Sequence, residues 1–379
     1  MTDEQIARKK QYAGAKKPSM KRRDDHHDYC ERRMYMITIE TEGRSPIFGK
    51  LEGDPFAPAG SEKAPRIELT ELGKAVQSEW MGIHGYYPQI EVKGIQMMPD
   101  HLHGILFVTA PLPVHLGQVI SGFKAGCRKA QRALEQAATR MAAAKPLPTG
   151  RSATSQLPAV PLPEPPAPQQ AASQQAAASQ QAAAVPSLPY RPLFAKGYND
   201  LILRSYDELS AWINYLHDNP RRLMMKRARP ELLRPFFNLR IGTQCYSGIG
   251  NRQLLSAPCR MAVRLSRRLS DSDIEREIGS HLEAARQGAV LVSPAISPGE
   301  KRVMRAAFDA GLPTIVLMEN GFGPLSKPHG EQFYACAKGT LLMLSPWEHH
   351  NDRRRLTAHQ CQQLNLMALE IASLKQHHQ

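Results

Sequence analysis

The sequence predicts a chain with two folded parts, an α+β part followed by an α/β part. Its 379 residues exceed what one hydrophobic core usually holds and are typical of two domains. The first half has β-type segments set around amphipathic helices, whereas the second half alternates short apolar segments with helical ones. Strands that alternate with helices favour a parallel, Rossmann-like sheet, so we expect one in the second half.

The composition indicates a polyanionic partner. The chain carries 49 Lys and Arg residues against 35 Asp and Glu residues, a formal charge of +14. This excess favours nucleic acid over a membrane surface, and the alternative is a soluble basic protein without such a partner. The N-terminus is charged, and the longest uncharged stretch, 165–190, is built from Gln, Pro and Ala rather than Leu and Ile. We therefore expect neither a signal peptide nor a membrane span.

The cysteines indicate a reducing compartment. Six of them are spread along the chain without a CxxC pair. In a chain of this size they are typical of reduced thiols, and they give a zinc finger no support. We therefore expect a cytoplasmic protein.

Residues 1–32 are polar and basic and offer little to bury. They predict a flexible arm, which either contacts phosphates or is only a solvated tail. Order is expected from Arg33, where a β-rich segment begins.

The segment 34–40 is typical of a strand that is buried on at least one face. Further strands are expected at 46–51, at 66–69 and at 90–96, the last with a bulge at Gly94, and a helix is expected at 70–84. Pro99-Asp100 predicts the turn of a hairpin that leads into a strand at 101–108.

Two histidines lie two residues apart in that last strand. Because side chains alternate along a strand, His101 and His103 point the same way while Leu102 points into the core. Two imidazoles on one face of a rigid strand begin a divalent-metal site that needs a third ligand. The alternative is a pair of polar residues on the wet face of a half-buried strand. Asp100 either orients His101 or serves only the turn.

A helix is expected at 116–134, because Leu116, Val119, Ile120, Phe123 and Cys127 recur at spacings of three and four. Its cations lie on or beside the opposite face, and they form either a solvated surface or a track for phosphates. They are Lys124, Arg128, Lys129 and Arg132.

Residues 145–190 change character. They are rich in Pro at both ends and contain a repeat of Ala, Ser and Gln from which no core can be built. They predict a flexible insertion within a domain, because strand-like sequence resumes at 192–194.

A second helix is expected from a capping box at Ser205 and Glu208, with Pro220 as its end. Tyr215 and Asn219 lie one turn apart at the edge of its apolar stripe. Considered alone, Tyr215 is typical of a residue that packs at a helix edge, and Asn219 is typical of a residue that ends a helix. Further cations follow at Arg221, Arg222, Lys226 and Arg227.

These motifs together resemble the single-tyrosine HUH transposases, namely the single-strand insertion-sequence transposases and the REP-associated tyrosine transposases. Met-Pro-Asp-His-Leu-His-Gly-Ile-Leu (98–106) is followed, after the basic helix and the insertion, by Tyr-Leu-His-Asp-Asn-Pro (215–220). The resemblance covers residues 33–228, and the insertion departs from the compact pattern of the family. It implies a ferredoxin-like antiparallel sheet with flanking helices, the HUH nuclease fold.

The resemblance also implies a site. His101, His103 and Asn219 would bind Mg²⁺ or Mn²⁺, and Tyr215 would be the nucleophile. A metal held by neutral ligands polarises the scissile phosphate, and a phosphotyrosine preserves the bond energy for rejoining. The implied substrate is single-stranded DNA with hairpin ends, contacted by the cations of both helices. Family members often work as dimers, so a homodimer is an open alternative.

The region 231–379 alternates strands and helices. Strands are expected at 261–265, 289–292, 314–318 and 341–344, and helices at 270–287, 298–310 and 356–374. The pattern resembles the Rossmann domains of the DNA-processing protein A and LOG-type group. The segment 293–299 follows a strand and opens a helix, a geometry that can bind a phosphate. Gly321-Phe322-Gly323 lacks the third glycine of a dinucleotide fingerprint.

The sequence therefore predicts an arm at 1–32, a transposase domain at 33–228 and a Rossmann-like domain at 231–379 whose role is open. The expected function is a metal-dependent transposase that cleaves and rejoins single-stranded DNA. Two alternatives remain, an inactive DNA-binding protein and a nucleotide sensor that acts through the C-terminal domain.

Overall fold

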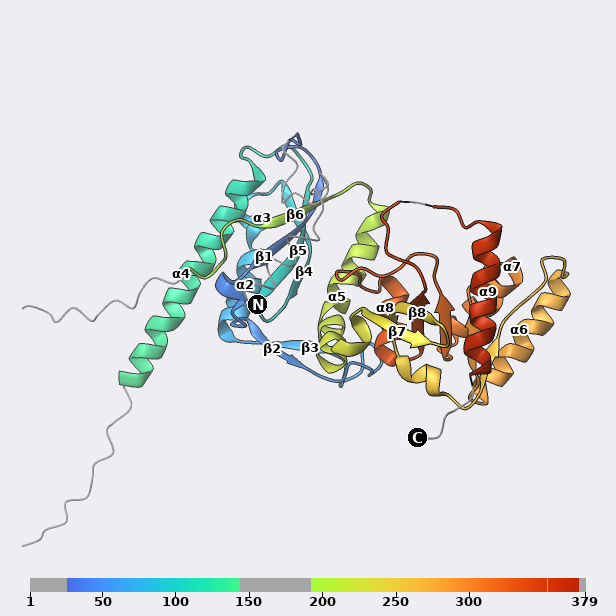
Figure 1. Ribbon diagram of the computed structural model, residues 1–379. Helices are drawn as coiled ribbons and strands as arrows, with labels where there is room; N and C mark the ends of the chain where they lie inside the picture. The colour runs from blue at the N-terminus through green and yellow to red at the C-terminus, as the bar shows by residue number, and fades with distance from the viewer. Residues whose placement is uncertain (1–25, 144–191, 353, 375–379) are drawn as a thin grey trace, which may run out of the picture. The chain divides into compact units, whose positions relative to one another are not determined.

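The computed structural model describes residues 26–143, 192–352 and 354–374 (Figure 1). The expected insertion at 145–190 and residues 1–25 of the expected arm lie outside the described residues. The last residues of the arm are part of the fold, because Tyr29 is buried and its hydroxyl donates to Asp200 at 2.7 Å. Order thus begins before Arg33.

The described chain forms two compact units. One, here the histidine unit, comprises the residues up to Lys50 together with Leu69–Leu209. The other, here the C-terminal unit, comprises Leu51–Glu68 and the chain from Ser210 onward. This division differs from a boundary after residue 228, because the helix that carries Tyr215 belongs to the C-terminal unit from Ser210 onward.

The histidine unit is an antiparallel sheet with flanking helices, as the sequence predicts. Its strands are arranged in the order β4-β5-β1-β6. The chain order is β1, α2, β4, β5, α4 and β6, a βαββαβ connectivity of the kind called ferredoxin-like. The elements are β1 (Met34–Glu40), η2 (Glu42–Arg44), β2 (Gly49–Glu52), α2 (Glu71–Met81), α3 (Ile83–Tyr86), β4 (Ile90–Met97), β5 (His101–Val108), α4 (Leu116–Ala143) and β6 (Asn199–Leu203).

Helices α2 and α4 lie side by side against the sheet (Figure 1). Tyr35, Ile37 and Leu102 point from the strands into their shared core. The fit is close at Gly104, because a Cβ atom there would lie 2.2 Å from the Trp80 ring. Alternation along the strands therefore places the other side chains of β1 and β5, including both histidines, on the opposite face.

The predicted hairpin is confirmed, with a register shift between Val92 and Gly94 at the expected bulge. The expected strand at 192–194 is reduced to one isolated bridge between Phe194 and Thr41. The strand that completes this edge of the sheet is β6, whose polar start (Asn199-Asp200) concealed it.

The helix that carries Tyr215 differs from its prediction at both ends. Helix α5 spans Asp207–Ala228 and contains Pro220 in its interior. Proline removes one hydrogen bond from a helix, and tertiary packing overrides that local cost, because Met225 beyond it is buried in the core beside α8. The expected capping box does not form, since Glu208 accepts from the backbone N–H of Arg204 at 3.3 Å.

The C-terminal unit contains a six-stranded sheet in the order β7-β8-β12-β11-β10-β9. The strands β9 to β12 are parallel, as expected, and the unforeseen hairpin of β7 and β8 adds two antiparallel strands. The elements outside α5 are β3 (Arg66–Leu69, paired with β2), η3 (Pro230–Leu233), β7 (Phe236–Ile241), β8 (Gln244–Gly250), η4 (Arg252–Ser256), β9 (Arg260–Ala262), α6 (Asp271–Arg286), β10 (Val290–Ser293), α7 (Pro298–Asp309), β11 (Thr314–Leu317), α8 (Gly330–Lys338), β12 (Leu341–Ser345) and α9 (Ala358–Ser373).

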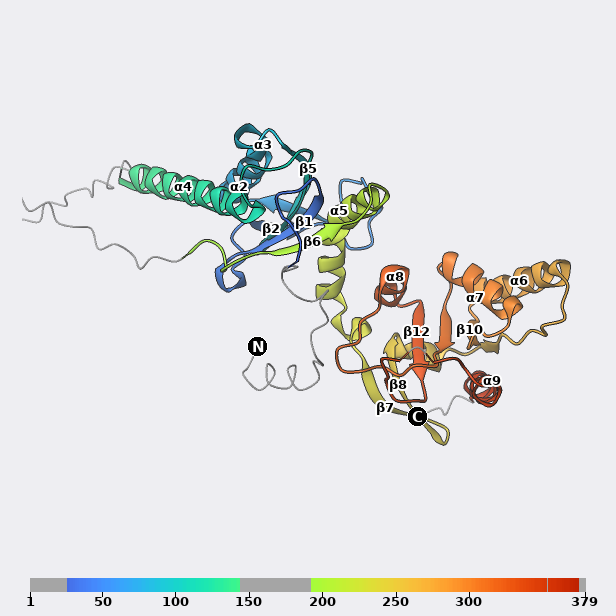
Figure 2. The same ribbon diagram turned by 90° about the horizontal axis from the view of Figure 1, so that it is seen from above.

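Helices α6, α7 and α8 cover one face of this sheet and α9 covers the other (Figure 2). The parallel strands follow one another in sequence order, so the order does not reverse among them as it does in a doubly wound sheet. Among the described helices, none is both long and apolar enough to cross a bilayer.

Candidate active-site residues

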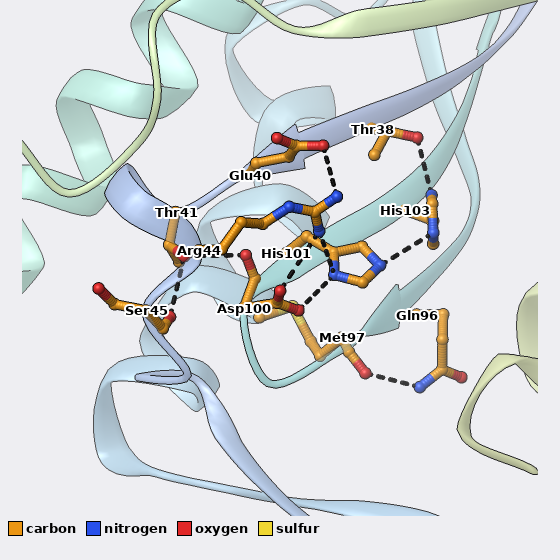
Figure 3. A network of polar contacts seen from close by, with 10 residues as sticks. All are labelled: Thr38, Glu40, Thr41, Arg44, Ser45, Gln96, Met97, Asp100, His101 and His103. Atoms are coloured by element: carbon orange, nitrogen blue, oxygen red, sulfur yellow. Dashed lines mark hydrogen bonds and ion pairs between the residues drawn. The ribbon is translucent and has the colours of Figure 1, made fainter. Parts of the chain in front are cut away.

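His101 and His103 point toward one another from the open face of β5 (Figure 3). Their Nε2 atoms are 3.2 Å apart, and their rings lie nearly at right angles. Leu102 between them is fully buried on the other face. The strand therefore presents two imidazole nitrogens at one point, as the spacing predicts.

The other nitrogen of each ring is held by a neighbour. Asp100 Oδ1 lies 2.6 Å from His101 Nδ1, and Thr38 Oγ1 lies 2.8 Å from His103 Nδ1. Asp100 thus orients His101 in addition to serving the turn. When Nδ1 carries the proton, Nε2 is left with a lone pair, which is the form of histidine that binds a metal.

Arg44 closes the network on one side. Its guanidinium pairs with Glu40 at 2.8 Å and with Asp100 at 3.3 Å. The guanidinium also lies 3.2 Å from His101 Nδ1. Because a guanidinium can only donate hydrogen bonds, the carboxylate of Asp100 is the acceptor for both the Arg44 guanidinium and the His101 ring. The backbone of Arg44 is in the left-handed region, with φ at 57°, which aims its side chain back at β5.

Burial lowers the pKa of both rings. The pKa of His103 falls to about 3, chiefly through burial and further through the proximity of His101 and Arg44. Burial also lowers the pKa of His101, against the opposing effect of Asp100. Both imidazoles are therefore neutral at neutral pH.

The pair fits a divalent ion. Two nitrogen ligands bound about 2.1 Å from one ion at a right angle lie about 3.0 Å apart, which is close to the observed separation. Within the part of the chain that the structure describes, no third His, Cys, Asp or Glu joins them in a metal-binding group. Imidazole suits a transition ion better than Mg²⁺, so of the two expected ions the donor set favours Mn²⁺.

Tyr215 and Asn219 lie one turn apart on α5, in the C-terminal unit. Tyr215 is 40% exposed, whereas Asn219 is buried and its Nδ2 has no hydrogen-bond partner among the described residues. A buried amide N–H group without a partner is uncommon in folded proteins. The histidine pair belongs to the other unit.

The expected DNA-contacting cations divide into two groups. Lys124 donates to the carbonyls of Ala195 and Gly197, and Arg221 donates to those of Pro55 and Ala57, so both serve the fold. Arg222 is likewise held by α8, as described below. The cations that remain at the surface are Arg128, Lys129 and Arg132 on α4 and Lys226 and Arg227 on α5.

The expected phosphate loop at 293–299 already holds an anion. The buried carboxylate of Glu300 accepts from the backbone N–H groups of Ile296 and Ser297, at 2.9 and 3.0 Å, and from that of Leu265. The N–H groups that would bind a phosphate are therefore bonded within the fold.

The chain also contains functional candidates that sequence reasoning missed. Thr38 is opposite His103 in the pairing of β1 with β5, and its place could be inferred only once that register is known. Arg44 follows Gly43 in a turn, and a non-glycine residue there gives no signal in the sequence. Asp218 and Tyr334 pair across 116 residues.

Comparisons with known proteins give no family for this chain. No family model matches it. An uncharacterized protein of Haemophilus influenzae is 28% identical over 81 residues, which are 21% of this chain and 39% of that protein's length.

Two solved structures are similar to parts of the chain. The DNA processing protein A of Helicobacter pylori, described by its single-stranded DNA binding mode, is 17% identical, with a TM-score of 0.28 over 37% of this chain and 66% of that one. A REP-associated tyrosine transposase bound to a REP hairpin is 10% identical, with a TM-score of 0.27 over 52% of this chain and 70% of that one. Both TM-scores and identities are low, so the function must be argued from the residues.

Proposed function

We propose that the protein is a metal-dependent transferase of single-stranded DNA that uses Tyr215 as its nucleophile. One observation carries the proposal, namely the convergence of the Nε2 atoms of His101 and His103 at 3.2 Å with both Nδ1 atoms held by other residues. This is the arrangement of two ligands prepared for one ion. The motif resemblance that links this strand to the tyrosine helix supplies the reaction class.

In this proposal His101, His103 and Asn219 hold the ion, which when bound polarises the scissile phosphate. The Tyr215 oxygen attacks the phosphorus in line, the bond from phosphorus to the 3′ oxygen breaks, and the phenol proton ends on that oxygen. The product is a 5′-phosphotyrosine with a free 3′-OH. Attack by another 3′-OH reverses these steps, so strands are joined without a further energy source.

The unpaired strand would be held by the surface cations Arg128, Lys129 and Arg132 of α4 and by Lys226 and Arg227 of α5. Cations along a helix neutralise backbone phosphates without regard to base sequence. Hairpin ends would then supply the selectivity that these contacts lack.

The test is the formation of a covalent adduct. Full-length protein is incubated with Mn²⁺ or Mg²⁺ and single-stranded DNA from the hairpin-bearing ends of its own locus, and the adduct is mapped by peptide mass. We expect one modified residue, Tyr215, and no adduct when the ion is chelated. Tyr215→Phe and His103→Ala should abolish it, whereas Tyr86→Phe, which alters another exposed tyrosine, should leave it unchanged.

The alternatives give other results. An adduct on another tyrosine, or one that forms in Tyr215→Phe, overturns the assignment of the nucleophile. Tight binding of single-stranded DNA with no adduct in any metal would indicate the DNA-binding protein without catalysis.

A further inference from the structure

Two side chains of α5, Asp218 and Arg222, lie on the same face of the helix as the candidate nucleophile Tyr215. Tyr215, Asp218 and Arg222 are spaced by three and four residues, so they are stacked along successive turns. All of them belong to the C-terminal unit, together with α8. The contacts that fix this face therefore come from within one compact body.

Tyr334 of α8 is bonded to two of these residues. Its hydroxyl donates to Asp218 Oδ2 and accepts from Arg222 Nη1 at 3.1 Å. The hydroxyl thus uses both its donor and an acceptor on α5. Burial raises the pKa of Tyr334, and the bond to Asp218 raises it further, so the hydroxyl stays protonated.

Arg222 connects this cluster to Tyr215. Its guanidinium lies 4.1 Å from the centre of the Phe333 ring and 5.9 Å from that of Tyr215. A cation held between aromatic rings is attracted to each of them, and the planar guanidinium stacks better than an ammonium does. A continuous set of contacts therefore runs from α8 through Arg222 to the Tyr215 ring.

A second set of hydrogen bonds holds the same turn of α5. Arg221 Nη1 donates to the carbonyls of Pro55 and Ala57, in the segment between β2 and β3, at 2.8 and 2.6 Å. Arg221 Nε also lies 3.7 Å from Asp218. Asp218 therefore faces both Arg221 and Tyr334, and the turn that follows Tyr215 is held from two directions.

We propose that Tyr334 is a positioning residue for Tyr215, acting through Asp218 and Arg222, which makes the C-terminal α/β fold a working part of the transferase. The inference rests on the proposed role of Tyr215 as nucleophile. Its physical basis is that in-line attack requires the phenol oxygen to be placed closely, and a displacement of about 1 Å can cost about 100-fold in rate.

The test uses the full-length chain with Tyr334→Phe, which keeps the ring and removes only the hydroxyl. We expect the single-turnover rate of adduct formation to fall about 10-fold with no change in the DNA concentration that gives half the maximal rate. The matched control is Tyr246→Phe, a buried tyrosine in the same unit whose hydroxyl has no partner among the described residues. It should keep the wild-type rate.

Two further variants separate positioning from general damage. Asp218→Asn retains an acceptor for Tyr334 and should keep most of the rate, whereas Asp218→Ala should lose as much as Tyr334→Phe. Amide hydrogen exchange gives a readout independent of activity. Faster exchange confined to residues 212–219, with β10 unchanged, is the expected result for Tyr334→Phe.

The outcomes are distinguishable. A Tyr334→Phe protein with unchanged rate and unchanged exchange overturns the positioning role, as does a loss of protection that spreads equally to β10. If the wild-type protein forms no adduct, the proposed function is wrong. The comparison of hydrogen exchange between the wild type and Tyr334→Phe then still decides whether Tyr334 holds α5 in place.

Discussion

His101 acts with residues that fix its ring. The carboxylate of Asp100 fixes the proton on Nδ1, and Arg44 in turn fixes that carboxylate. Mutation of a residue that orients a metal-binding histidine typically weakens metal affinity about 10- to 100-fold. The chemistry of the candidate site thus depends on side chains that would not touch the ion.

Asp100→Ala tests this dependence. Without the carboxylate, the proton on His101 is free to move to Nε2, so we expect Mn²⁺ to bind about 10- to 100-fold more weakly. Titration calorimetry measures the affinity directly, without DNA. Asp352→Ala removes an exposed carboxylate that pairs with Arg354 and should bind Mn²⁺ as the wild type does. Equal affinities in the two variants would contradict the orienting role.

Gly104 is required by packing rather than by backbone conformation. A Cβ atom there would lie 2.2 Å from Trp80, whose side chain is fully buried. Gly104→Ala should therefore lower the free energy of unfolding by about 2–3 kcal/mol, measured by urea denaturation. Gly122→Ala in α4 meets nothing within 4 Å and should instead raise it by about 0.5–1 kcal/mol. A mild effect at Gly104 would show that the indole can move aside.

At the scale of elements, α4 and α8 each bury one face, and that face includes a cysteine. Cys127 of α4 and Cys336 of α8 are fully buried, whereas Cys245 and Cys259 are exposed. Burial raises the pKa of Cys336 to about 12 and also raises that of Cys127. Since the thiolate is the reactive form, the faces of the helices determine which cysteines react.

A thiol reagent at pH 8 should therefore modify Cys245 and Cys259 within minutes and leave Cys127 and Cys336 unmodified until the protein unfolds. The pKa of Cys336 is higher in the folded than in the unfolded chain. Its contribution to stability is thus fully present below about pH 9 and is lost as the pH rises toward 12. Mass spectrometry of peptides checks the labelling, and rapid modification of Cys336 in folded protein would contradict its burial.

For the whole molecule, charge is the dominant property, with a formal value of +14. Several of the cations are used inside the fold, as Lys124 and Arg221 show. The net charge therefore overstates the number of cations that are available to bind DNA. We expect the surface cations of α4 to be the ones that bind phosphates.

Replacing Arg128, Lys129 and Arg132 together by Ala should weaken binding of single-stranded DNA and flatten its salt dependence. Three lost phosphate contacts correspond to a slope of log K against log salt that is smaller by about 2. The control removes three cations elsewhere, with Arg276, Arg286 and Lys301 changed to Ala in the C-terminal unit. Fluorescence anisotropy at several salt concentrations measures both. Equal slopes in the two triple variants would show that only net charge matters.

The sequence by itself determined the features that depend on local periodicity. The pleat of a strand put His101 and His103 on one face, and a glycine marked the bulge in β4. Helix periodicity likewise places Tyr215 and Asn219 one turn apart on α5, whereas their site roles come from the motif resemblance. Each of these features requires only residues that are close neighbours in the chain.

Tertiary structure decided everything that depends on distant residues. Thr38 reaches His103 across 65 residues, Glu300 occupies the loop that looked free for phosphate, and α5 continues through Pro220 because Met225 beyond it is buried in the core beside α8. In each case packing or pairing between remote segments outweighs a local preference, and no pattern within one segment records that energy. Local patterns thus identify which groups the chain presents, and long-range packing determines which of them are oriented, buried or already bonded within the fold.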